Sequence, residues 1–228
     1  LVAMSIISDS CDLTALENRY YVHNGLHNVR NPLIQAMLPS AVKRYGLTPT
    51  GYSWAMVPLI NAVCREEETG NKYKIFDAFS GHGDIEEALK ICRSAHRSQS
   101  EVVKQAVEEI EPSLDTKHKV IIGFADKSLA NQVGLIANKF QSKYHKPVIL
   151  LREVDSITLS GSLRSPVGLR EEINNSNLAN ALGHSKACGI LVRKSNLNRL
   201  IDCLNNLDIP TTPEIEVAGY IAPRQINN

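Results

Sequence analysis

The feature that most constrains the fold is a long amphipathic segment in the middle of the chain, residues 84–110. Its apolar side chains recur along one stripe at helical spacing, and Asp84 with Glu87 forms a capping-box pattern at its start. A helix rises about 1.5 Å per residue, so this one extends roughly 40 Å. Its middle, residues 93–101, is polar, which favours a connector between two lobes. A plain core helix is the alternative.

The pattern that follows the connector predicts an α/β lobe. Residues 120–125 and 147–151 are continuous apolar runs typical of buried strands, and residues 129–144 between them have helical spacing. A strand–helix–strand unit implies a parallel pair with a right-handed crossover. Further strands are expected over 156–162 and 188–192, with helices over 169–182 and from a Ser195 cap to about 207.

The part before the connector is expected to open on a strand. Residues 1–7 are an apolar run that resembles a buried strand, closed by Asp9, with no initiating Met. A protein rarely begins inside its own sheet, so we expect a piece of a longer polypeptide. Helices are predicted over 17–30, over 33–45 and from Pro58 to about 68, with a loop at 49–51.

Charge and cysteine usage narrow the partners. With 25 basic and 24 acidic side chains the formal net charge is +1, so any polyanion must be held by local clusters. The five cysteines are scattered, with no Cys-x-x-Cys, which is typical of reduced thiols in a cytoplasmic protein. No apolar run approaches the length of a membrane span, so no membrane partner is expected.

Two polar segments in the second lobe are poor core material and good anion-binding material. Residues 159–166 place Arg164 between Ser162 and Ser165 at the end of a strand. A guanidinium is a planar fork of N–H donors suited to phosphate, and the hydroxyls add hydrogen bonds. Residues 181–189 then carry Gly183 and His184 in a turn beside the next strand, where glycine lets backbone approach a ligand.

Three weaker candidates each have an ordinary structural alternative. Asn61 and Arg65 lie four residues apart on a predicted helix and could grip a phosphate, or simply form a solvated face. Asp9 could be a metal or ligand contact at a strand end, or a turn residue, with Asp12 as a rival. His184 could touch ligand or be structural. We find no nucleophile–His–acid triad, P-loop or Gly-x-Gly-x-x-Gly turn.

Taken in order, four segments resemble motifs of RecJ, the single-strand-DNA-specific 5′→3′ exonuclease family of the DHH phosphoesterase superfamily. Residues 2–19 resemble the fourth DHH motif and its Glu-Asn-Arg, and residues 58–65 resemble the Gly-Pro-Arg-Leu-Asn-Ala-Ala-Gly-Arg element. In the DHH-associated domain, residues 160–165 resemble the Gly-Ser-x-Arg-Ser element and residues 183–189 the Gly-Gly-His-x-x-Ala-Ala-Gly element.

The resemblance implies an α/β fold in which a remnant of a DHH domain is joined by a long connector helix to a DHH-associated domain with a mixed sheet. The expected boundaries are 1–80 for the C-terminal part of the DHH domain, 81–112 for the connector, 113–208 for the substrate-binding domain and 209–228 for the start of a further β domain.

The family hydrolyses phosphodiester bonds of single-stranded DNA with two Mn²⁺ or Mg²⁺ ions. By resemblance, Asp9 would be the one catalytic metal ligand in this chain, the other ligands lying upstream. Gly183 and His184 would contact the strand, and a single-strand-binding protein is a candidate partner. The groups implied to bind substrate phosphate are Asn61, Arg65, Ser162, Arg164 and Ser165.

The chain departs from the family pattern at three places. Leu59 stands where many members have Arg, Leu182 replaces the first Gly before His184, and Ser128 with Leu129 stands where a Trp-His pair is common. We therefore expect a divergent, phage-like member. The family's Asp-x-Asp, second Asp and Asp-His-His motifs lie upstream of its fourth motif, and Asp9 alone cannot hold two ions, so we expect that the present fragment does not hydrolyse DNA. Two alternatives stay open: a DHH phosphoesterase acting on short RNA or cyclic dinucleotides, and an inactive DHH adaptor in a replication complex.

Overall fold

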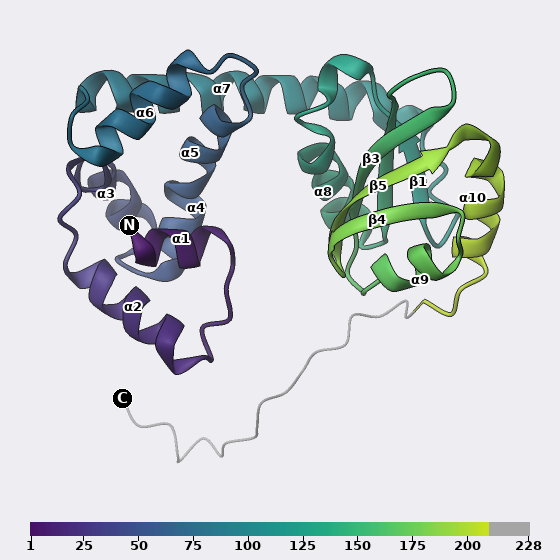
Figure 1. The fold of residues 1–228 in the computed structure, drawn as a ribbon, viewed down its shortest axis with the longest axis horizontal. Coiled ribbons are helices and arrows are strands. Elements are labelled where there is room, and N and C mark those ends of the chain that lie inside the picture. The colour runs from purple at the N-terminus through teal and green to yellow at the C-terminus, as the bar shows by residue number, and fades with distance from the viewer. Residues whose placement is uncertain (210–228) are drawn as a thin grey trace. The chain divides into compact units, whose positions relative to one another are not determined.

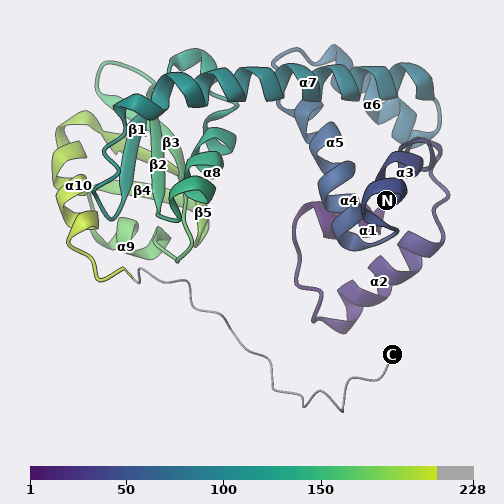
Figure 2. The same cartoon turned by 180° about the vertical axis from the view of Figure 1, so that it is seen from behind.

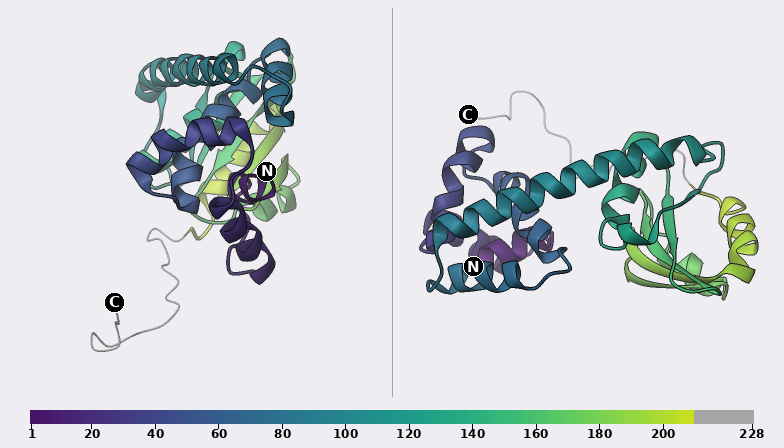
Figure 3. Two further views of the ribbon diagram at one scale, coloured as in Figure 1. Left: turned by 90° about the vertical axis from the view of Figure 1, so that its left-hand side faces the viewer. Right: turned by 90° about the horizontal axis from the view of Figure 1, so that it is seen from above.

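The computed structural model describes residues 1–209, apart from the side chains of residues 39–41 and 43–45. The chain forms two compact units, the first being Leu1–Gln105 and the second beginning at Ala106 (Figure 1). The long helix is confirmed: α7 (Ile85–Ile110) runs unbroken through the end of the first unit and into the second (Figure 3). Asp84 caps it, its Oδ1 accepting from the N–H groups of Glu86 at 2.8 Å and Glu87 at 3.0 Å.

The regular secondary structure of residues 1–105 is helical. Six helices precede α7: α1 (Val2–Ser8), α2 (Leu16–His27), α3 (Pro32–Tyr45), α4 (Pro49–Ala55), α5 (Val57–Cys64) and α6 (Gly70–Ser80). Fully buried Leu33, Met56, Ala78 and Cys92 mark a core shared by α3, α6, α7 and the α4–α5 junction. The loop expected at 49–51 is wrong, because Thr48 caps a helix there by accepting from Gly51 N–H.

The strand expected over residues 1–7 is also wrong, since these residues form α1. Ala3 and Ile7, four residues apart, are the buried positions of α1, which is helical spacing and not strand alternation. α1 packs closely on α2, because a Cβ added to Gly25 would lie 2.3 Å from the Cβ of Ala3. Asp9 is consequently a helix C-cap residue and not the end of a strand.

The second unit is an α/β unit around a five-stranded mixed sheet of order β1-β2-β3-β5-β4. The predicted strand–helix–strand unit is confirmed, with β1 and β2 parallel and α8 between them in the chain. The remaining neighbours pair antiparallel. The elements are β1 (Ile121–Phe124), α8 (Val133–Tyr144), β2 (Val148–Glu153), β3 (Thr158–Arg164), α9 (Arg170–Asn175), β4 (Ala179–His184), β5 (Ala187–Arg193) and α10 (Leu197–Asn205).

The two faces of this sheet are covered differently (Figures 1 and 2). One face carries Ile149, Leu163 and Ile190 into a core with Ile173 of α9 and Leu200 of α10. On the other face α8 packs on β2 and β3. The side chains that β4 and β5 direct to this second face of the sheet are exposed, so α8 covers only half of that face and leaves the half over β4 and β5 open.

The helix expected over 169–182 is only half right. α9 ends at Asn175, and residues 179–184 form β4, in which buried Ala179 and Ala181 alternate with exposed Asn180 and Leu182. This period of two is the signature of a half-buried strand, and pairing with β5 decides it. The last helix is confirmed, but Ser195 lies in a short 3₁₀ turn before it and provides no side-chain cap.

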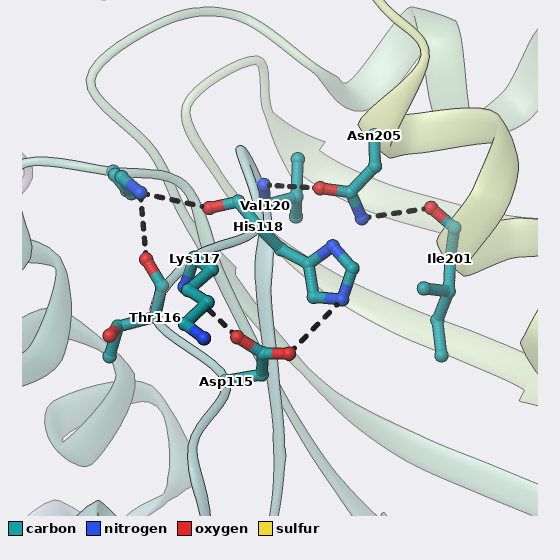
Figure 4. Close-up of polar contacts among 8 residues, drawn as sticks. Asp115, Thr116, Lys117, His118, Val120, Ile201 and Asn205 are labelled. Carbon is teal, nitrogen blue, oxygen red and sulfur yellow. Dashed lines mark hydrogen bonds and ion pairs between the residues drawn. The ribbon is translucent and has the colours of Figure 1, made fainter.

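A polar cluster fixes the entry to the sheet (Figure 4). The Oδ1 of Asn205 on α10 accepts from the N–H of Val120 at 3.0 Å, while its Nδ2 donates to Ile201 O. Asp115 accepts from Lys117 N–H and pairs with His118 at 3.4 Å. The bond of Asn205 to Val120 ties the segment leading into β1 to α10, and the contacts of Asp115 stabilise the turn within that segment.

Two expectations from the sequence concern a further β domain and a membrane partner. The further β domain over 209–228, including the strand from Glu214, falls on residues beyond the described range. Within that range, no helix combines the length and apolar character needed to cross a membrane.

Candidate anion-binding site

Arg164 lies at the end of β3 against the second residue of α8. Its Nη1 donates to the Oγ of Ser162 at 2.5 Å and to Leu163 O at 2.7 Å. A Cβ built on Gly134 of α8 would lie 2.7 Å from Arg164 Nη2 and 3.3 Å from Ser162 Oγ. Because Gly134 has no side chain, the guanidinium fits between helix and strand in a defined orientation.

The two polar segments identified in the sequence, residues 159–166 and 181–189, meet where β3 ends and where β4 turns into β5. β4 and β5 form a tight hairpin whose tip is Ser185 and Lys186. Ser165 N–H donates to Lys186 O at 2.9 Å, and Leu169 N–H donates to Ser185 O at 3.0 Å. The backbone after Arg164 is therefore joined directly to the turn that follows His184.

Gly183 gives this hairpin its shape. Its φ of 132° lies in a region that side chains rarely allow, and an added Cβ would lie 3.1 Å from Ala187 O. Its carbonyl accepts from Nη1 of Arg170 at 2.8 Å. The turn is thus held from α9 by a cation.

Strand register places Arg164 and His184 on the same face. Arg164 is opposite Ala187 on β5, and Ala187 is opposite His184 on β4. Directly opposite residues of antiparallel strands project to one side of a sheet. Arg164 is half-buried and His184 exposed, with the small Ala187 between them.

The electrostatic surroundings are basic. Cys188 lies on the buried side of β5, and burial raises the pKa of its thiol. The positive charges of Arg164 and Arg170 act in the opposite direction on that pKa. Ser162 Oγ donates to the carbonyl of this cysteine at 3.5 Å. The arrangement can hold an anion by charge and hydrogen bonds, and Ser165 serves locally by accepting from Val167 N–H.

The remaining sequence candidates lie in the first unit. Asn61 is exposed on α5, while half-buried Arg65 is the C-cap residue, because the helix expected to reach 68 ends at Cys64. Asp9 is exposed, and its carboxylate accepts a long contact, 3.9 Å, from the thiol of Cys11. The phosphate-binding roles of Asn61 and Arg65 and the metal-ligand role of Asp9 stay predictions.

Asp12 has a local role instead. Its carboxylate accepts from Thr14 Oγ1 and N–H, both at 2.7 Å, and these bonds lower the pKa of Asp12. It therefore stabilises a turn two residues ahead of α2, which begins after Ala15 without a side-chain cap.

The described residues do not form a two-metal site. Over residues 1–209, His, Cys, Asp and Glu side chains nowhere gather in a group of three that could hold an ion. Asp9 alone fits at most one ligand position, since two-metal centres need several carboxylate or imidazole ligands.

Sequence patterns missed two residues that shape the site. Gly134 falls inside a helical pattern, where an isolated glycine often has a packing reason, and this was the available signal. The sequence around Arg170 offers no comparable signal, because its hydrogen bond to the Gly183 carbonyl joins a helix to a strand thirteen residues further along the chain.

Comparison with solved structures defines the class of fold. RecJ from Thermus thermophilus in complex with Mn²⁺ superposes with a TM-score of 0.71 at 19% identity, over 89% of this chain and 31% of that chain. The Mg²⁺ complex gives 0.70 over 33% of its chain. A further exonuclease RecJ bound to manganese gives 0.59 over 52% of its chain. The chain thus has the fold of a portion of RecJ.

Curated relatives point the same way by sequence. YorK of Bacillus subtilis (strain 168), provisionally named as an SPbeta prophage-derived single-strand DNA-specific exonuclease, is 28% identical over an alignment of 265 positions. Its counterpart in Bacillus phage SPbeta matches identically. The alignment covers 98% of this chain and 45% of each relative, so the chain spans about half the length of the relatives it matches. No family model matches. The chain is RecJ-like and a distant homologue of these nucleases.

Proposed function

We propose that this chain is the strand-binding portion of a RecJ-like, metal-dependent 5′→3′ exonuclease, and that it captures the 5′-phosphorylated end of single-stranded DNA. In this proposal residues 1–80 are the end of a DHH domain, 81–112 the connector and 113–208 the DHH-associated domain. Hydrolysis of the phosphodiester bond belongs to a longer protein of the relatives' size.

One observation carries the proposal: Arg164 is oriented by Ser162 and Leu163, against Gly134, at the point where the hairpin turn after His184 is bonded to the backbone that follows β3. Arginine binds phosphate through two parallel N–H···O bonds. A terminal phosphate carries close to two negative charges near neutral pH, whereas an internal diester carries one. A fixed guanidinium therefore favours the 5′ end over the rest of the strand.

The other sequence candidates take supporting roles in this proposal. Ser162 and Ser165 orient Arg164 and the backbone beside it, Gly183 and His184 contact the strand, and Asn61 and Arg65 add phosphate contacts from the first unit. Asp9 would contribute one ligand to Mn²⁺ or Mg²⁺, the ions named in the RecJ complexes. Such ions activate water and neutralise developing charge in phosphoryl chemistry.

The test is binding of short 5′-phosphorylated and 5′-hydroxyl single strands, measured by fluorescence anisotropy. Removing a charged hydrogen-bonding partner costs about 1.5–3 kcal/mol, so Arg164→Ala should weaken binding of the phosphorylated strand by roughly 10- to 150-fold. Binding of the 5′-hydroxyl strand should change much less.

Arg199→Ala is the matched control, since Arg199 is an exposed arginine on α10, which covers the opposite face of the sheet. Arg164→Lys keeps the charge but loses the fork, and should restore only part of the affinity. Equal affinity of the native chain for the two kinds of strand would contradict the proposal.

A further inference from the structure

The open half of the sheet continues from Arg164 along the whole of β5. Beyond the row that joins Arg164 to His184, the next row is Ser162, Gly189 and Leu182. Leu182 is 87% exposed, although it is a large apolar side chain. Since Gly189 has no side chain and Ser162 is buried, this row forms a low strip beside a projecting leucine.

The strip ends at an amide-lined groove. The row after Leu182 pairs Ser160, Leu191 and Asn180, and the last pairs Thr158 with Arg193. Asn180, Leu191 and Arg193 line a cavity of about 530 Å³ with three further asparagines of the α9 region and the start of α10. The amide of Asn174 both donates to and accepts from the backbone of Ala181, and the amides of Asn177 and Asn196 each donate to a backbone carbonyl. An amide both donates and accepts, so exposed Asn180 on the open face is the group of this groove suited to the edge of a nucleobase.

The charged side chains that the strands direct to this open face are all positive. β3, β4 and β5 contain no acidic residue, and the charged side chains that they direct to the open face are Arg164 at one end and Arg193 at the other. Arg152 of β2 shares that face, opposite Ser160. A strip with cations at both ends and apolar side chains between them complements a polyanion whose bases can pack on it.

We propose that single-stranded DNA, held by its 5′ phosphate at Arg164, runs along this open face toward Arg193 and places a base in the asparagine-lined groove. This inference rests on the proposed function and adds the direction and length of the bound strand. Six residue steps of β5 separate Ala187 from Arg193, about 20 Å at 3.3 Å per residue. At about 3.4 Å per stacked nucleotide that distance holds about six nucleotides, and fewer in an extended strand.

The experiment compares two 5′-phosphorylated strands, a dinucleotide and a hexanucleotide, on the 228-residue chain. The dinucleotide fills only the Arg164 end, whereas the hexanucleotide reaches the groove. Arg193→Ala should weaken hexanucleotide binding about tenfold and reduce its salt slope by about one phosphate, with the dinucleotide unchanged. Asn180→Ala should weaken the hexanucleotide less and leave the salt slope unchanged.

One control and one further test variant keep the result interpretable. Arg199→Ala makes the same change of charge on α10 and should alter neither affinity. Leu182→Glu changes an 87%-exposed side chain, so the fold is retained, but it adds a negative charge midway along the strip. It should weaken the hexanucleotide at least as much as Arg193→Ala.

The outcomes separate this inference from the proposed function. If Arg164→Ala weakens both strands while Arg193→Ala, Asn180→Ala and Leu182→Glu weaken neither, the end site stands and the strip is refuted. A loss of dinucleotide binding in Arg193→Ala equal to that of the hexanucleotide also refutes it. If Arg164→Ala changes neither affinity, the proposed function itself fails.

Discussion

Gly134→Ala offers the sharpest test of how the anion site is built. The added methyl would lie 2.7 Å from Arg164 Nη2 and 3.3 Å from Ser162 Oγ, so something must move by several tenths of an ångström. The nearest atom is the tip of a flexible side chain and not backbone, so the guanidinium moves and the fold does not. Alanine is also the better helix former, by up to about 1 kcal/mol.

The expected result is therefore unusual: binding falls while stability stays. A displaced guanidinium that loses one charge-assisted hydrogen bond to phosphate forfeits about 1.5 kcal/mol, which is roughly tenfold in affinity. Anisotropy with a 5′-phosphorylated strand measures this loss, and thermal unfolding followed by circular dichroism should give a melting temperature no lower than that of the native chain.

A double-mutant cycle shows whether Gly134 acts through Arg164. If the methyl works only by moving the guanidinium, Gly134→Ala should have no further effect in the Arg164→Ala background. Gly70→Ala is the matched control, because its added Cβ would meet its nearest neighbour at an ordinary 3.5 Å. Native affinity in a folded Gly134→Ala chain would refute this account of the site.

Three further predictions concern stability and reactivity. Gly161→Ala should cost about 3 kcal/mol or more in urea unfolding, since its Cβ would lie 1.9 Å from the Leu150 carbonyl oxygen, and a native-like midpoint would contradict this. Burial raises the pKa of Cys92 to about 11, so at pH 8 iodoacetamide should label exposed Cys64 and spare Cys92, as peptide mass spectrometry would show. Hydrogen bonds from a lysine and a tyrosine lower the pKa of Glu111 below 4.5, so its contribution to stability is present above that pH and lost as the pH falls. Glu111→Gln should flatten the pH dependence of the melting temperature below about pH 5.

Much of the second unit, and the long helix that leads into it, could be predicted from local sequence pattern. The parallel β1–β2 pair, its crossover helix and the long α7 all rest on apolar runs and stripes of sufficient length for their period to be unambiguous. The two polar segments of the site could also be located, because serines, an arginine and glycines interrupt strands that are otherwise apolar.

Short segments could not be assigned in this way. Residues 1–7 are apolar enough for either a strand or a helix, and packing of Ala3 on Gly25 accompanies the helix. Residues 179–184 follow the Asn-Asn-Ser-Asn run of residues 174–177, where Asn177 adopts a positive φ of 57°, and pairing with β5 makes them a strand. In both places the deciding partner lies outside the segment itself.

The sequence by itself determined which residue types could bind an anion and in which lobe they lie. Only the tertiary structure decided that Arg164 lies against Gly134, that Ser165 is joined to the hairpin after His184, and that half of one sheet face is open. The physical reason is that donor chemistry belongs to single residues, whereas orientation and exposure depend on contacts between strands and helices far apart in the chain.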